Sequence, residues 1–158
     1  MNEGPSKELT TLRVSRTFAA PRDIVFGAWT DPAALKHWYR PPDASITSVE
    51  MDVRDGGAYR IAYQRAGVTA QLVGTYLDVK PVELLVFTWR WDPPVLDAMD
   101  TGETRVTVRF RDLGPETEVV LVHEKLRSRE VREFHESGWS VVLDQLAAAV
   151  SARQSGRR

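Results

Sequence analysis

The residue best suited to chemistry in this sequence is His123, which continues an apolar alternation begun by Val119 and Leu121. Alternate residues of a strand share a face, so we expect the imidazole to point into the interior. A histidine there can bind a ligand carbonyl, transfer a proton or respond to pH. It can equally be a core histidine tied to a backbone carbonyl or a tyrosine. Glu124 should point to the opposite face and is a poor partner for it.

The other reactive side chains favour no metal, cofactor or nucleophile site. His37 and His135 fall on separate predicted elements, and the spacing His-Glu-x-x-His is absent. No cysteine is present, and neither a Gly-x-Ser-x-Gly elbow nor a phosphate-binding loop occurs. We therefore expect no cofactor, no metal and no assigned catalytic residue.

Polar and aromatic tips on the predicted inner faces instead favour a ligand pocket. An empty apolar void of ~300 Å³ would cost roughly 7 kcal/mol, so polar tips or a guest molecule must stabilise such a space. Gln71 belongs to a strand whose inner face the pattern leaves open: Gln71 and Val73 oppose Leu72 and Tyr76. The candidate ligand-binding residues are Tyr59, Tyr63, Gln71, Trp89, His123, Phe134, Gly138 and Val142.

A long C-terminal helix is predicted to carry three of these candidate residues, Phe134, Gly138 and Val142. Residues 128–153 form one amphipathic segment, with Phe134, Gly138, Trp139, Val142 and Leu146 predicted along its apolar side. Gly138 costs about 1 kcal/mol relative to alanine in a helix interior. Close approach to a sheet, or room for a guest molecule, explains a glycine there.

Alternating segments bounded by turn residues predict the sheet on which this helix lies. Pro21 and Asp31-Pro32 start two short helices between the first strand and the others. The connections between later strands are short, which favours antiparallel neighbours. The predicted strands cover residues 9–19, 45–53, 58–64, 69–79, 84–92, 104–112 and 118–125.

Length and charge suit one domain that binds neither nucleic acid nor membrane. The 158 residues carry 21 Lys and Arg against 22 Asp and Glu, a formal net charge of -1. Nucleic acid and anionic membranes favour a basic surface, and neither a signal peptide nor a membrane-spanning run is evident. We expect a disordered tail at 1–8, a single domain at 9–153, a disordered tail at 154–158 and a cytoplasmic location.

An ordered set of short motifs resembles the bacterial Aha1-like (activator of Hsp90 ATPase homologue) family of the START/Bet v 1-like, or SRPBCC, superfamily. The resemblance spans roughly residues 10–149. It implies an α+β helix-grip fold, in which a curved antiparallel sheet and two short helices surround a long C-terminal helix. The motifs are Ala20-Pro21, Val25-Phe26, Ala28-Trp29-Thr30-Asp31-Pro32, Trp38, Met51-Asp52, Asp55-Gly56-Gly57, Gly74, Tyr76, Phe87-Thr88-Trp89, Val106-Thr107-Val108, His123 and Gly138-Trp139.

The expected function is binding of a hydrophobic or aromatic small molecule between sheet and helix. Three alternatives remain open: a cyclase or hydrolase using His123 with a tyrosine, a chaperone-regulator module that contacts an Hsp90-type partner, and an antibiotic sequestration or self-resistance protein. Binding is favoured over catalysis. The acidic and apolar loop 93–102 is further expected to act as a mobile lid.

Overall fold

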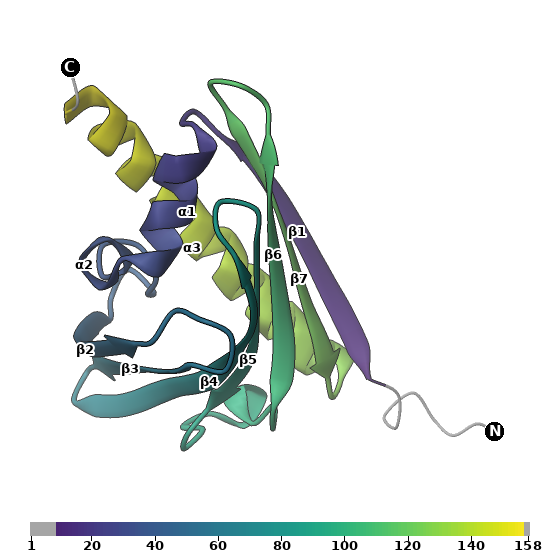
Figure 1. Cartoon of the computed structure of the whole chain (residues 1–158). Helices are drawn as coiled ribbons and strands as arrows, with labels where there is room; N and C mark the ends of the chain where they lie inside the picture. The colour runs from purple at the N-terminus through teal and green to yellow at the C-terminus, as the bar shows by residue number, and fades with distance from the viewer. Residues whose placement is uncertain (1–8, 157–158) are drawn as a thin grey trace.

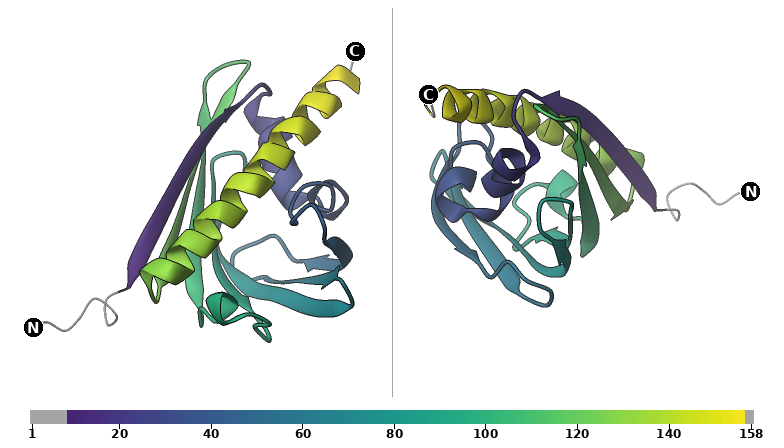
Figure 2. Two further views of the ribbon diagram at one scale, coloured as in Figure 1. Left: turned by 180° about the vertical axis from the view of Figure 1, so that it is seen from behind. Right: turned by 45° about the horizontal axis from the view of Figure 1, so that its top comes forward.

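The computed structural model describes residues 9–156, in which a seven-stranded antiparallel sheet curves around a long C-terminal helix (Figures 1 and 2). The strand order is β1-β7-β6-β5-β4-β3-β2, so the sheet has β1 and β2 at its edges. This confirms the predicted helix-grip architecture. The elements are β1 (Thr10–Phe18), α1 (Arg22–Thr30), α2 (Pro32–Leu35), β2 (Ser45–Met51), β3 (Ala58–Arg65), β4 (Val68–Lys80), β5 (Leu84–Trp91), the 3-10 turn η2 (Asp97–Met99), β6 (Thr104–Asp112), β7 (Thr117–Leu126) and α3 (Arg129–Gly156).

The two short helices begin where the sequence indicates. Pro21 occupies the N-cap of α1, and the Asp31 carboxylate accepts a hydrogen bond from the Ala33 amide at the start of α2, 3.1 Å away. α2 ends at Leu35. The chain then turns, and the Trp38 indole donates to the Ala28 carbonyl at 3.1 Å, which fixes the following segment against α1.

The predicted alternation places the core correctly on β3, β5, β6 and β7, and the structure resolves the ambiguous strand. On β4, Leu72 and Tyr76 are buried. Gly74 shares their face, where a Cβ atom would lie 2.6 Å from the ring of Tyr59 and 2.0 Å from the Thr88 carbonyl oxygen. Glycine is therefore required for Tyr59 to lie across its neighbouring strand.

Helix α3 runs diagonally across the sheet and packs most closely on β1 (Figure 2). Its buried face is rotated from the predicted one: Phe134 is 41% exposed, whereas His135 is only 5% exposed. The physical reason is that the sheet curves away from α3 towards β3, so residues on that side meet open space instead of the core. The buried residues of the helix are Val131, His135, Trp139, Leu143, Leu146 and Val150.

The structure describes only part of the two predicted tails. The predicted tail at 1–8 lies outside the described residues. At the other end α3 extends to Gly156, beyond the predicted helix end at Arg153, and so includes residues assigned to a disordered tail.

The loop between β5 and β6, where a mobile lid is expected, is hydrogen-bonded to Arg127 just before α3, and the lid stays a prediction. Arg127 donates to the carbonyls of Asp97 and Asp100, at 2.8 and 2.5 Å, and Met99 is buried at 7% exposure. These contacts hold the loop beside the start of α3.

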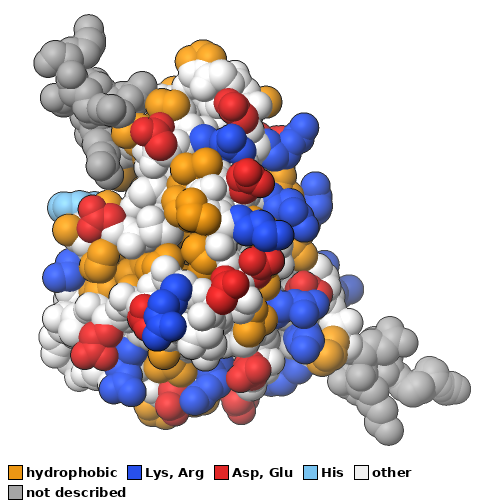
Figure 3. All heavy atoms as spheres, viewed as in Figure 1, with side chains coloured by type: hydrophobic (Ala, Val, Ile, Leu, Met, Phe, Trp, Pro, Cys, Tyr) orange, Lys and Arg blue, Asp and Glu red, His pale blue; other side chains and the backbone are white. Residues whose placement is uncertain are grey.

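The visible surface carries both signs of charge without a broad basic field (Figure 3). Lysine and arginine side chains alternate there with aspartate and glutamate. Within residues 9–156, no helix has the length and apolarity needed to cross a membrane.

Candidate functional site

A solvent-accessible cavity of about 490 Å³ lies where α3 and the curved sheet diverge. Its walls come from α3, from residues of β3, β4 and β5, and from residues 39–43, which lie between α2 and β2. We call this space the helix–sheet cavity. Its aromatic wall consists of Tyr39, Tyr63, Trp89, Trp91, Phe134, His135 and Trp139.

Side-chain contacts hold the connecting segment over this cavity. Gln145 of α3 donates from Nε2 to the carbonyls of Trp38 and Arg40, at 2.9 and 2.6 Å. The Tyr63 hydroxyl donates to the Tyr39 carbonyl at 2.8 Å. At the rim, Arg65 forms a 2.8 Å ion pair with Asp43. The segment is thereby bound to both the helix and the sheet.

His123 lies behind the aromatic wall, fully buried. The Thr104 hydroxyl has one proton and gives it to the Trp89 carbonyl, 2.6 Å away, so it accepts from His123 Nε2–H at 2.8 Å. His123 Nδ1 accepts from the Trp139 indole N–H at 3.1 Å. Both ring nitrogens are therefore occupied in one neutral tautomer.

His135 completes a second, parallel arrangement. Its Nδ1–H donates to the Val131 carbonyl at 2.8 Å, one helical turn earlier. Its Nε2 accepts from the Trp91 indole at 3.3 Å. The two imidazoles lie 5.8 Å apart, and the ring of Trp89 contacts both edge-on.

Burial makes these histidines poor proton carriers. Loss of solvent, together with the neighbouring His135, lowers the pKa of His123 to about 3. Burial also lowers the pKa of His135, partly opposed by its bond to the Val131 carbonyl. A general base that must change charge near neutral pH requires a higher pKa and access to substrate. His123 has neither.

The structure brings together five of the eight sequence-predicted residues. Tyr63, Trp89, Phe134, Gly138 and Val142 all line the helix–sheet cavity.

The remaining three lie elsewhere. His123 is behind the wall, and the Tyr59 hydroxyl donates to the Thr88 carbonyl at 2.6 Å, away from the cavity lining. Gln71 is on the outer face, because Leu72 and Tyr76 occupy the inner one. The expectation that these three line the pocket is corrected accordingly.

Sequence reasoning missed His135, Trp91 and the segment 39–43 as parts of the wall. A signal for His135 was available, because Val131, His135, Trp139 and Leu143 recur every four residues. Trp91 shares the alternation of Trp89. The connecting segment has no such periodicity, and its position depends on tertiary hydrogen bonds.

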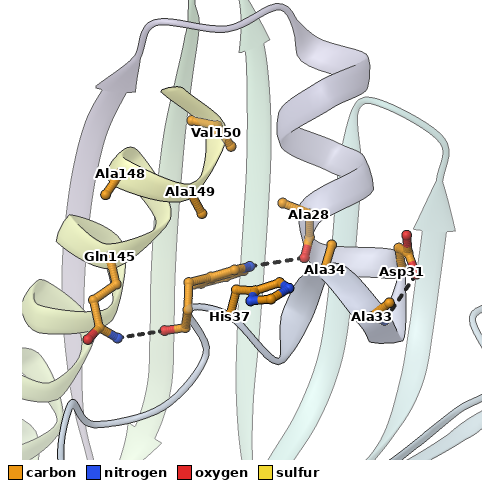
Figure 4. A pocket seen from close by; sticks show the side chains of 10 residues that line it. Ala28, Asp31, Ala33, Ala34, His37, Gln145, Ala148, Ala149 and Val150 are labelled. Carbon is orange, nitrogen blue, oxygen red and sulfur yellow. Dashed lines mark hydrogen bonds between the residues drawn. The ribbon is translucent and has the colours of Figure 1, made fainter. Parts of the chain in front are cut away.

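A second hollow, of about 720 Å³, lies between the short helices and the C-terminal half of α3 (Figure 4). Small side chains such as Ala34 and Ala149 form much of its surface, with His37 beside them. Two of its polar side chains already serve the fold: the Trp38 indole donates to the Ala28 carbonyl, and Gln145 donates to the Trp38 carbonyl. Despite its size it lacks the concentrated aromatic wall of the helix–sheet cavity.

The part of the chain that the structure describes contains no cluster of three or more His, Cys, Asp or Glu able to hold a metal ion. His123 and His135 are adjacent, yet their ring nitrogens are directed to hydrogen-bond partners.

Comparison with known proteins shows that residues 19–151 match the family described as "Activator of Hsp90 ATPase homolog 1-like protein". Protein CV1439 from Chromobacterium violaceum is 31% identical, with a TM-score of 0.79 over 89% of this chain and 96% of that one. The AHSA1 protein SPO3351 from Silicibacter pomeroyi is 26% identical, with a TM-score of 0.79 over 91% and 99%. Protein NE0264 from Nitrosomonas europaea, 20% identical with a TM-score of 0.76 over 97% and 99%, shares the fold. No curated protein matches the chain.

Proposed function

Because the chain belongs to the activator of Hsp90 ATPase homologue 1-like family, whose START-like fold commonly binds hydrophobic ligands, we propose that it binds a hydrophobic or aromatic small molecule in the helix–sheet cavity. The observation that carries this proposal is the aromatic wall around an accessible space of about 490 Å³. That volume lies within the range of sites for drug-sized ligands.

The shape of the wall favours a flat guest. Trp89 and Trp91 meet edge-on at 5.3 Å, and Tyr63 meets Trp91 edge-on at 5.7 Å. Such packing presents ring faces and edges at which another aromatic ring can stack or make edge contacts.

Gly138 provides access on the helix side. A Cβ atom added there would meet nothing within 4 Å, so this turn of α3 opens to the cavity. The glycine weakens the helix by about 1 kcal/mol relative to alanine, and space for a guest accounts for its position.

The histidines support reversible binding in preference to proton transfer. His135 lines the cavity, but both of its ring nitrogens are engaged, and His123 is separated from the cavity by the wall. The contacts of the two histidines hold the rings of Trp89, Trp91 and Trp139 in place. They leave no imidazole nitrogen free to react with a ligand.

A graded series at Gly138 tests the proposal. Gly138→Ala should raise the free energy of unfolding by about 1 kcal/mol and leave the affinity for a naphthalene-based fluorescent probe within about twofold. Gly138→Leu should also fold at least as stably as the natural protein, yet bind the probe at least about tenfold more weakly, because its side chain fills the cavity. Chemical denaturation and fluorescence titration measure the two quantities. A folded Gly138→Leu protein with unchanged probe affinity would refute the site.

A further inference from the structure

We propose that the ligand of the helix–sheet cavity is an aromatic carboxylate, whose rings lie against the aromatic wall while its carboxylate accepts a hydrogen bond from the Arg40 guanidinium at the rim. This inference rests on the proposed function, since it specifies the chemistry of the same site. The aromatic wall accounts for the rings of such a ligand, and Arg40 accounts for its charge.

The first observation is a positive charge without a carboxylate partner. Arg40 lines the cavity and is half-buried. None of the ion pairs formed by the described residues includes it. The other charged residues of the lining, Asp43 and Arg65, are paired with each other at 2.8 Å. With two arginines and one aspartate, the lining carries a net positive charge, which the single negative charge of a carboxylate balances.

The second observation is that backbone carbonyls hold the Arg40 guanidinium in place. Its Nη1 donates to the carbonyls of Pro41, Pro42 and Ala44, at 3.4, 3.3 and 3.0 Å. Its Nε donates to the Lys36 carbonyl at 3.3 Å. Pro41 and Pro42 line the cavity too, so these bonds keep the guanidinium within the segment that forms the rim. A side chain that is already fixed loses less conformational entropy when a ligand binds.

The third observation is that one nitrogen of this guanidinium is left for a ligand. Nη2 of Arg40 carries N–H donors and forms no hydrogen bond within the part of the chain that the structure describes. The buried side-chain nitrogens that lack a partner belong to Trp29, Trp89 and Arg132, so Nη2 of Arg40 is not one of them. Nη2 is therefore open to solvent, and a ligand oxygen can reach it.

The surroundings separate an anionic end of the ligand from an aromatic end. Pro41 and Pro42 beside Arg40 are exposed, so a carboxylate bound there keeps part of its hydration and costs less to bind than one buried among the aromatic rings. Farther from the rim, His123 and His135 are held neutral by their hydrogen bonds and offer no charge. The site thus suits rings inside the cavity and a carboxylate at its edge.

Fluorenone-2-carboxylate and fluorenone-2-carboxamide form a matched pair of probes, because they share a tricyclic frame and only the carboxylate is charged. We expect both to bind the natural protein, the carboxylate more tightly. Arg40→Gln should lower the preference for the carboxylate, measured by calorimetry as the ratio of the two dissociation constants, by about tenfold. Arg60→Gln removes a positive charge from an exposed position of β3 outside the cavity lining and should leave the ratio unchanged.

NMR of the natural protein gives a readout that does not depend on the folding of any variant. The guanidinium ¹⁵N signals of Arg40 should shift on saturation with the carboxylate and move less with the carboxamide, because the hydrogen bond to a charged acceptor is stronger. The carboxylate assignment is wrong, while the binding function stands, if the carboxamide binds at least as tightly, if folded Arg40→Gln keeps the natural ratio, or if both probes shift the Arg40 signals equally. If neither probe binds, the proposed function and this inference both fail.

Discussion

His123 and His135 show how neighbouring residues decide whether an imidazole is reactive. Each has one nitrogen bonded to an indole N–H, from Trp139 or Trp91, and the other bonded to an oxygen acceptor. These bonds fix the tautomer and exclude substrate from the nitrogens. A histidine in a sequence suggests proton transfer. In this fold, both histidines support the aromatic wall.

The depressed pKa values predict acid lability. In the unfolded chain a histidine gains a proton near pH 6.5, whereas folded His123 resists protonation until about pH 3. The unfolded state therefore binds more protons below pH 6.5, and the free energy of unfolding falls as the pH is lowered through that window, by up to about 1.4 kcal/mol per pH unit for each such histidine.

Urea denaturation between about pH 7 and about pH 4 measures this dependence. His123→Gln removes one titrating group, so its stability should fall less steeply with acid than that of the natural protein. His37→Gln, at an exposed position, serves as the control and should keep the natural slope. Parallel slopes for the natural protein and His123→Gln would contradict the account.

The sequence identified the burial of His123 but not its partners. Alternation with Val119 and Leu121 is a local property, so it predicts the face correctly. The partners Thr104 and Trp139 come from another strand and from α3, and no local pattern encodes that meeting.

Among the elements, the segment 39–43 matters most for the site because it forms one wall without regular structure. It is held by Gln145 from the helix and by the Tyr63 hydroxyl from the sheet. Removing either contact should loosen the wall while leaving the sheet intact.

Gln145→Met tests this role with a side chain of similar length. Loss of two hydrogen bonds to the carbonyls of Trp38 and Arg40 should lower the free energy of unfolding by about 1 to 2 kcal/mol. Hydrogen exchange should become faster at the amides of Tyr39, Arg40 and Ala44 and stay unchanged in β6 and β7, which serve as internal references. Unchanged exchange at Tyr39, Arg40 and Ala44 would show that the segment does not depend on Gln145.

Among the elements, the strands were the most predictable, because short turns and period-two alternation leave few other positions at which a strand can begin or end. Thr104–Asp112 was predicted to the residue. The face of α3 was predicted less well, since its aromatic side meets both core and cavity. Only the curvature of the sheet, a non-local property, separates exposed Phe134 from buried His135.

For the molecule as a whole, two hollows lie beside different parts of α3. The larger one, beside α1 and α2, is lined mainly by small side chains, and its Trp38 and Gln145 side chains are hydrogen-bonded within the fold. The helix–sheet cavity has the aromatic wall. Chemistry, not volume, distinguishes the candidate binding site.

The five tryptophans of the chain report on both hollows at once. Trp89, Trp91 and Trp139 line the helix–sheet cavity, and Trp38 lines the other hollow. Titrating the ¹⁵N-labelled protein with fluorenone and following the five indole N–H signals by NMR therefore tests the central claim directly. We predict that the signals of Trp89, Trp91 and Trp139 shift with the same saturation curve while that of Trp38 stays in place. A saturable shift confined to Trp38, or no saturable shift of any indole signal, would contradict binding in the helix–sheet cavity.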